Sequence, residues 1–330
     1  MTTGTITGLP VYDTEYLIGA FGVIDTPNTF LRELAFFTEQ VFDTAQVAFD
    51  KVDRAKRLAP FVSPYSRGTT MKQQGFQTKD FRPAYVKPKH VVDPSRPLKR
   101  MPGERLLGAM TPEERYHRVL AELFAEQDAQ IKRTEEWMAA QILLNGAVVV
   151  EGDDYAPQLV SFGRPSTHTV QLTGANAWGQ SGVSALDNLR SWNALVAIDS
   201  GFNANVVVMD PVAARLFTAD TQVKQVLDNR VNTPTGPNGD QFRIGNINLA
   251  GVNAGAIGEE VKSLGYIGEF HVFVYNNTFK DAAGNLQTML PPGTVLMLAP
   301  TGVQGTRLYG AIQDPKAGFR ALPRFPKMWV

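Results

Sequence analysis

The chain has 330 residues with balanced charge, 32 Lys and Arg against 32 Asp and Glu, and 43% of its residues are hydrophobic. This composition predicts a folded protein of one large or two ordinary domains and excludes an intrinsically disordered chain. The absence of cysteine excludes disulfides and thiolate zinc sites. No segment has the pattern of a signal peptide or a membrane span, so we expect a soluble protein made in the cytoplasm.

The N-terminal part of the chain is acidic. Residues 1–50 contain seven acids and a single base. We expect residues 1–27 to form an extended tail and a short helix to follow, capped by Asn28 or Thr29. The alternation of apolar and polar residues over 41–52 weakly predicts a strand. The helical residues expected to share an apolar face are Phe30, Leu31, Leu34 and Phe37.

Residues 67–105 carry the opposite charge. They contain ten Lys or Arg against three acids, together with five prolines, and no run among them has enough apolar residues to build a core. A flexible linker would not be so long, so charged and so stiffened by proline, and we expect an arm that lies on another molecule. Oppositely charged segments in one neutral chain favour pairing between proteins over nucleic-acid binding.

The clearest predicted element is a long helix. Thr111 is a good N-cap, Pro112 suits the first helical position, and a glutamate two residues further on completes a capping box. Gly146 ends the helix, which would be about 50 Å long. Apolar residues at every third or fourth position predict one buried stripe, and Glu135 and Glu136 are interpreted as part of the solvated face.

The second half of the chain predicts a mixed α+β unit. Residues 147–151 and 158–162 are typical of a hairpin, and the unit itself is expected over 184–300. A loop rich in Pro, Gly and Asn is expected over 229–239. The other expected elements are helices at 184–200, 210–217 and 221–229, strands at 205–209, 241–252, 269–275 and 294–299, and strand-like pieces within 306–330.

No catalytic or metal-binding pattern is found. The four histidines are His90, His117, His168 and His271. They are scattered without the spacing of metal ligands, and the chain has no phosphate loop, nucleophile elbow or HExxH motif. His271 falls in an expected strand and is interpreted as a core or surface histidine. We therefore expect neither an enzyme nor a bound cofactor.

Two other functions are compatible with the composition, an enzyme and a nucleic-acid-binding protein. A mixed α+β enzyme would need a convergent polar pocket, and no motif supplies one. A nucleic-acid-binding protein could use segment 67–105, in which the aromatic residues Phe76, Phe81 and Tyr85 lie among Lys and Arg residues. Stacking platforms need a rigid sheet behind them, and this segment predicts none, so a protein surface is the preferred partner.

Four motifs follow one another in an order that is typical of one protein family. The first, residues 85–104, includes the run Tyr-Val-Lys-Pro-Lys-His. The others are residues 206–217, 309–314 and 324–329. Together they make residues 28–330 resemble the lambda-type major capsid proteins of tailed bacteriophages.

The resemblance implies an α+β fold of the Hong Kong 97 type. It also implies a major capsid protein that self-assembles into the icosahedral shell enclosing the packaged double-stranded DNA of a tailed phage. The parts implied are an N-terminal arm (1–55), an extended loop (56–107), a peripheral domain with a long spine helix (108–182), an axial domain (183–304) and a C-terminal return to the peripheral domain (305–330).

The resemblance also implies partners and a location. The chain would bind copies of itself in hexamers and pentamers, and also a portal, a scaffold and a decoration or cementing protein. DNA would lie on the inner face without sequence-specific contacts, and no membrane would take part. The protein would reside in the virion capsid after assembly in the cytoplasm of the host bacterium, and we expect no covalent crosslink between subunits.

Three groups of residues are expected to contact neighbouring subunits. The extended loop would contribute Lys72, Lys79, Arg82, Tyr85, Lys87, Lys89, Arg96, Lys99 and Arg100. The N-terminal arm would contribute the acids Asp13, Glu15 and Asp25. The loop at the centre of a capsomer would contribute Asn229, Pro234 and Pro237.

Overall fold

The computed structural model describes residues 29–52, 58–59, 61–65, 76–99, 110–152, 155–231, 260–281, 283–302 and 305–325. The chain divides into two units. The smaller unit contains the described residues within 39–85 and 307–325, and the larger unit those within 29–38 and 86–306. Among the described helices, none combines the length and the apolar character that crossing a membrane requires.

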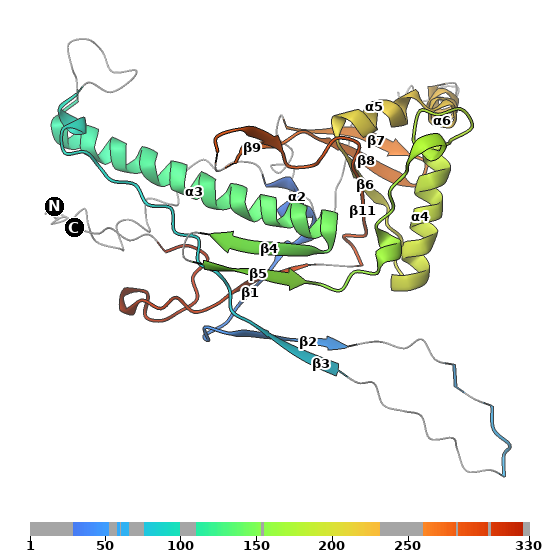
Figure 1. The fold of residues 1–330 in the computed structure, drawn as a ribbon, viewed down its shortest axis with the longest axis horizontal. Helices are drawn as coiled ribbons and strands as arrows, with labels where there is room; N and C mark the ends of the chain where they lie inside the picture. The colour runs from blue at the N-terminus through green and yellow to red at the C-terminus, as the bar shows by residue number, and fades with distance from the viewer. Residues whose placement is uncertain are drawn as a thin grey trace, which may run out of the picture. The chain divides into compact units, whose positions relative to one another are not determined.

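The smaller unit is built from paired strands (Figure 1). β2 and β3 form an antiparallel ribbon whose register places Val47 opposite Phe81 and Val52 opposite Phe76. β1 pairs with β12, and Arg307 on β12 binds Glu39 on β1 at 2.7 Å. The elements are β1 (Thr38–Val41), β2 (Val47–Val52), β3 (Phe76–Phe81), β12 (Thr306–Tyr309) and the 3-10 turn η5 (Pro315–Ala317).

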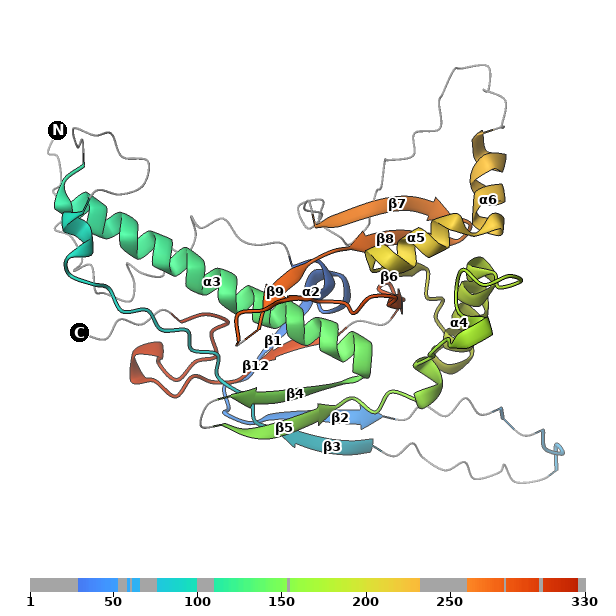
Figure 2. The same ribbon diagram turned by 45° about the horizontal axis from the view of Figure 1, so that its top comes forward.

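A four-stranded sheet forms the centre of the larger unit (Figure 2). β6 and β8 are parallel, and the two outer strands run antiparallel to their neighbours. β6 is buried along its whole length, as expected for an apolar run inside a sheet covered on both faces. The order across the sheet is β11 (Val295–Leu298), β6 (Val206–Met209), β8 (Phe270–Tyr275) and β7 (Val261–Ile267).

Helices cover both faces of this sheet. Val206 and Phe273 point to the face that α2 and the end of α3 cover, whereas Val207 and Val272 point to the face covered by α4, α5 and α6. The alternation of the strands thus divides the core into two apolar clusters. The helices are α2 (Phe30–Ala35), α3 (Pro112–Asn145), α4 (Ala185–Ser200), α5 (Pro211–Ala219) and α6 (Thr221–Val231).

Local capping signals explain where the helices begin and end. Thr111 and Glu114 form the predicted capping box of α3, and Gly146 ends α3 in the left-handed conformation with φ of 66°. Ser184 caps α4, and the Asp210 carboxylate accepts hydrogen bonds from the first amides of α5. The predicted helices are confirmed. They could be predicted because each cap depends only on residues close to it in the sequence.

Several predicted elements differ from the structure. Bends at residues 43–46 separate β1 from β2, so the single strand predicted over 41–52 is wrong. Phe37 lies beyond the end of α2 and is exposed, not part of its apolar face. The strand predicted over 241–252 lies outside the described residues.

Two hairpins and three 3-10 turns complete the described part of the larger unit. Strands β4 and β5 form the predicted hairpin beside α3 (Figure 2). β9 and β10 form a second hairpin that was not predicted. The bounds are β4 (Ala147–Gly152), β5 (Tyr155–Ser161), β9 (Thr278–Lys280) and β10 (Leu286–Thr288), with 3-10 turns η1 (Arg96–Leu98), η2 (Ser166–His168) and η3 (Gly174–Asn176).

Gly305 allows a close approach between two segments of the larger unit. Its amide donates a hydrogen bond to the carbonyl of Ala35. A Cβ atom at this position would lie 2.1 Å from the ring of Phe36 and 2.9 Å from the Ala35 carbonyl oxygen.

We expect Gly305→Ala to lower the free energy of unfolding by about 1–3 kcal/mol, because the added methyl group would overpack this contact. Denaturant unfolding measures this, with Gly152→Ala, which meets no atom within 4 Å, as the control. Equal midpoints for the two variants would contradict the prediction.

His271 is buried in the sheet between two aromatic rings. Its ring centroid lies 4.3 Å from that of Tyr266 and 4.2 Å from that of Phe273. Its Nε2 shares a hydrogen bond of 3.2 Å with Ser263 Oγ, whereas Nδ1 has no hydrogen-bond partner among the described residues. Burial lowers the pKa of His271, because a protonated ring would leave a charge in an apolar layer. Of the two interpretations of His271, as a core or a surface histidine, the structure shows the core one.

The lowered pKa of His271 predicts acid sensitivity. Below about pH 6.5 the imidazole of His271 is protonated in the unfolded chain, whereas in the folded chain it stays neutral until the pH is lower. The free energy of unfolding should therefore fall as the pH drops from about 6.5 to the folded-state pKa, by at most about 1.4 kcal/mol for each pH unit. Denaturant unfolding of the wild type and His271→Phe between pH 7.5 and 5 measures this. The difference between the two proteins should change with pH, and a constant difference would contradict the assignment.

Candidate inter-subunit surfaces

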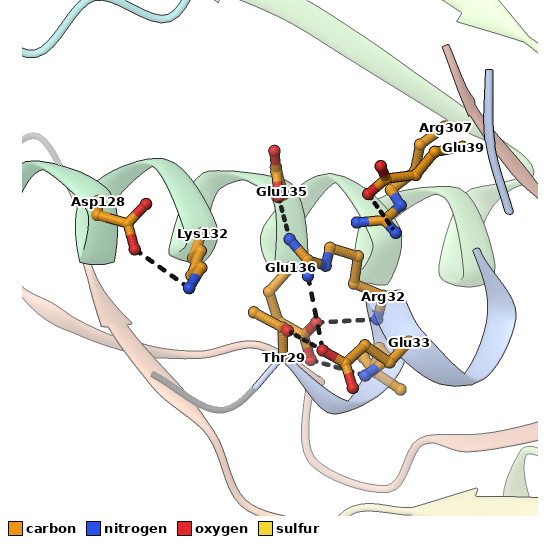
Figure 3. A network of polar contacts seen from close by, with 10 residues as sticks. Thr29, Arg32, Glu33, Glu39, Asp128, Lys132, Glu135, Glu136 and Arg307 are labelled. Atoms are coloured by element: carbon orange, nitrogen blue, oxygen red, sulfur yellow. Dashed lines mark hydrogen bonds and ion pairs between the residues drawn. The ribbon is translucent and has the colours of Figure 1, made fainter. Parts of the chain in front are cut away.

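A buried carboxylate anchors α2 within the larger unit (Figure 3). The two oxygens of Glu136 on α3 accept hydrogen bonds from the backbone amides of Leu31 and Arg32, each at 2.9 Å. The hydroxyl of Tyr275 on β8 donates a third hydrogen bond at 2.7 Å. Burial raises the pKa of Glu136, and burial together with the nearby Glu136 carboxylate raises the pKa of Tyr275. Three elements far apart in the sequence therefore meet at one side chain.

Arg32 adds ion pairs to the same anchor. Its guanidinium binds Glu135 on α3 and lies 3.5 Å from Glu33 on α2 (Figure 3). Arg32 is also the single base among residues 1–50. Because its charge is already balanced here, it is not available to neutralise the acids that precede α2 in the sequence.

The position of Glu136 corrects the interpretation of α3. Glu136 is 1% exposed and not part of a solvated face. It belongs to a row in which every fourth residue is buried, and at its middle the charged neighbours Asp128 and Lys132 bind each other at 3.1 Å. The spacing from the apolar residues of this row could have identified Glu136. The row is Leu120, Phe124, Asp128, Lys132, Glu136 and Ala140.

Part of the basic segment packs on its own chain. β3 pairs with β2, and the turn η1 packs against α3 with Pro97 buried. The expectation that this segment provides no sheet is therefore wrong for residues 76–81. The expectation that it forms an arm lying on another molecule stays a prediction, and burial of Pro97 stabilises its contact with α3.

The predicted basic contacts remain on the surface. The described ones that are exposed are Arg82, Lys87, Lys89, Arg96 and Lys99. Tyr85 is also exposed, but its hydroxyl donates to the carbonyl of Ala311 and accepts from the amide of Gln313 within the smaller unit. Lys79 lies on β3. The structure thus places a series of cations along residues 82–99 without assigning them a partner subunit.

Of the predicted contacts at the centre of a capsomer, only Asn229 falls within the described residues. It lies in α6, which continues to Val231, so the loop predicted from residue 229 is wrong for residues 229–231. The other residues lie outside the described ranges: Asp13, Glu15, Asp25, Lys72, Arg100, Pro234 and Pro237.

The connection between β2 and β3 carries apolar side chains that the sequence analysis did not single out. Leu58 is 94% exposed and Tyr65 is 99% exposed, and Phe61 is exposed completely. A soluble monomer seldom leaves several large apolar residues of one short segment in water. We call Leu58, Phe61 and Tyr65 the apolar tip.

The described residues contain no group of three or more His, Asp or Glu side chains able to hold a metal ion. A hollow in the smaller unit is lined by neutral side chains and one guanidinium, without an acid–base pair. The lining residues are Thr44, Ala45, Gln46, Arg82 and Gln313.

The sequence and the fold of this chain are similar to those of known proteins. Over residues 13–330 the sequence matches the family described as phage major capsid protein E. It is 30% identical to the major capsid protein of Escherichia phage lambda and 29% identical to that of Escherichia phage N15, with 91% of this chain and 84% of each relative covered. A crystal structure of a proposed capsid protein from a prophage of Escherichia coli CFT073 has the same fold, with a TM-score of 0.72, 19% identity and coverage of 96% of this chain and 89% of that one. This chain therefore belongs to the phage major capsid protein E family.

Proposed function

We propose that this chain is a major capsid protein that assembles with its own copies into the icosahedral shell around the packaged double-stranded DNA of a tailed phage. The observation that carries this proposal is the family match over residues 13–330. The exposed apolar tip supports it, because a tiled assembly would bury side chains that a monomer leaves in water. The role is structural and requires no catalytic group.

The fold suggests how the chain is divided within such a shell. We propose a Hong Kong 97-type arrangement, with α3 as the spine helix of the peripheral domain and residues 183–304 as the axial domain. Residues 1–55, which include β2, would belong to the N-terminal arm, residues 56–107, which include β3, to the extended loop, and residues 305–330 to the C-terminal return. The mixed α+β architecture supports this division.

The contacts between copies would combine charge and apolar burial. The exposed cations of residues 82–99 would lie on acidic surface of neighbouring subunits, such as their N-terminal segments, which carry an excess of acids. Hydrogen bonds between Lys or Arg and carboxylates are strong where water is excluded. Exposed pairs contribute only about 0–1 kcal/mol each, so apolar burial has to supply the rest.

The charge of the chain limits its role toward DNA. A formal net charge of zero gives the shell no electrostatic means of condensing a genome, so DNA would be driven in by a separate motor. DNA would then lie against the inner face without sequence specificity. We propose hexamers and pentamers of this chain as the building units, with a portal, a scaffold and a decoration or cementing protein as further partners, assembled in the host cytoplasm.

Sedimentation and electron microscopy of the expressed protein test the proposal. We expect closed particles of megadalton mass. Monomers that bind DNA in a salt-sensitive manner would favour nucleic-acid binding instead. Denaturing electrophoresis of mature particles should give a single monomer band, because we propose that no covalent crosslink joins the subunits.

A further inference from the structure

The first amides of α2 do not find acceptors in the usual way. Helix N-termini leave amide groups without intrahelical partners, and the side chain of the N-cap residue commonly accepts one of them. Thr29 occupies the N-cap position of α2 but makes no capping hydrogen bond. Its hydroxyl donates instead to the Glu33 carboxylate at 3.1 Å. Another group must therefore satisfy the amides at the start of α2.

Glu136 is that group, although it lies more than one hundred residues further along the chain. One of its oxygens accepts the amide of Leu31 and the other accepts the amide of Arg32. Tyr275 holds the carboxylate from the side of β8. The site excludes water, because Leu31 is fully buried and Glu136 and Tyr275 are each 1% exposed.

Apolar packing alone leaves the direction of α2 less well defined. Phe30, Leu31 and Leu34 bury their side chains in the core, and this burial is favourable but not directional. Hydrogen bonds to two successive amides depend on distance and angle, so they fix both the rotation and the direction of the helix. A helix of six residues is also too short to be stable by itself.

We propose that Glu136 acts as an N-cap from another element, a positioning residue that fixes α2 on α3 and β8. It would thereby hold α2 in one position on the larger unit. The consequence for assembly rests on the proposed function of the chain, because a shell requires every subunit to present its elements in the same place. The position of α2 itself does not depend on that function.

Hydrogen exchange resolved to single amides tests this assignment in full-length, unassembled subunits. Glu136→Gln keeps one carbonyl oxygen and replaces the other acceptor by a donor, so exchange at one of the two amides, Leu31 or Arg32, should accelerate by about tenfold or more. Glu136→Ala should accelerate both. Circular dichroism would verify that each variant is folded, and Glu136→Gln alone decides the question if Glu136→Ala does not fold.

Two further variants separate capping from general stability. Tyr275→Phe removes the third hydrogen bond and should lower the melting temperature while leaving exchange at Leu31 and Arg32 slow. Glu135→Gln weakens the contact with the Arg32 side chain and should also leave these amides protected. Unchanged exchange at both amides in folded Glu136→Gln would overturn the assignment, as would equal acceleration in Tyr275→Phe.

Sedimentation of the same proteins tests the link to assembly. We expect Glu136→Gln to give a smaller yield of particles than Glu135→Gln. Accelerated exchange combined with a wild-type particle yield would overturn the link but leave the capping role intact. A wild type that forms no particles would overturn the proposed function instead, and the exchange rates would still decide whether Glu136 caps α2.

Discussion

Replacing the apolar tip by serine should leave the subunit folded and abolish its particles. Leu58, Phe61 and Tyr65 make almost no contact within their own chain, so the triple variant should unfold at the wild-type denaturant midpoint. Burying a large apolar side chain contributes about 1.5–3 kcal/mol. Replacing all three side chains should therefore weaken each contact between subunits by about 5–9 kcal/mol. A loss of this size should prevent a stable shell. Sedimentation measures particle yield, and denaturant unfolding measures the integrity of the subunit.

A matched variant shows whether the effect belongs to the tip. Leu159, Ile198 and Leu286 are also largely exposed, and replacing them by serine removes three large apolar side chains outside residues 56–107. We expect that variant to retain far more particles than the tip variant. Normal particles from the tip variant would show that these side chains are not buried between subunits.

Neutralising the cations of the basic segment is expected to have the second-largest effect. Changing Lys87, Lys89, Lys99 and Arg100 to Gln removes four charges, three of which are described and exposed. At about 0.5 kcal/mol for each lost pair, every contact would weaken by about 2 kcal/mol. This corresponds to roughly 30-fold in the association constant of each contact. The particle yield should fall, and the remaining particles should dissociate at a lower salt concentration.

A control variant has the same net charge as the variant of the basic segment. Changing Lys224, Lys262, Lys280 and Lys316 to Gln removes four exposed charges outside the basic segment. If loss of charge alone reduces assembly, both variants should behave alike. If the basic segment meets acidic neighbours, the first variant should lose particles and salt tolerance while the control keeps both. Wild-type yield and salt tolerance in the first variant would remove the charge-pairing hypothesis.

Local sequence signals predicted the parts of the fold that depend on neighbouring residues. The helix α3 was predicted with both ends correct, because its capping box and its left-handed glycine act within a single turn. The buried strands β6 and β8 were visible as apolar runs. β7 was missed because a bulge between Ser263 and Gly265 interrupts its alternation.

Features that depend on distant parts of the chain were not predictable in this way. The ribbon β2–β3 and the pair β1–β12 join segments that no local pattern connects. Helical spacing could have placed Glu136 in the buried row of α3, but its hydrogen-bond partners, Leu31, Arg32 and Tyr275, lie in distant segments and were not predictable. The basic segment was noticed from its charge, but the apolar tip beside it became apparent only through the exposure of its side chains.

The pairing of β1 with β12 affects when a newly synthesised chain can complete its structure. β1 emerges early from the ribosome, but its partner spans Thr306–Tyr309 and emerges only after most of the chain has been translated. At about 5–20 residues per second, the first strand waits on the order of ten seconds or longer. A prematurely terminated chain would lack β12, so β1 would keep an open edge that chaperones and proteases can recognise. The topology thus favours removal of incomplete subunits before they can join an assembly.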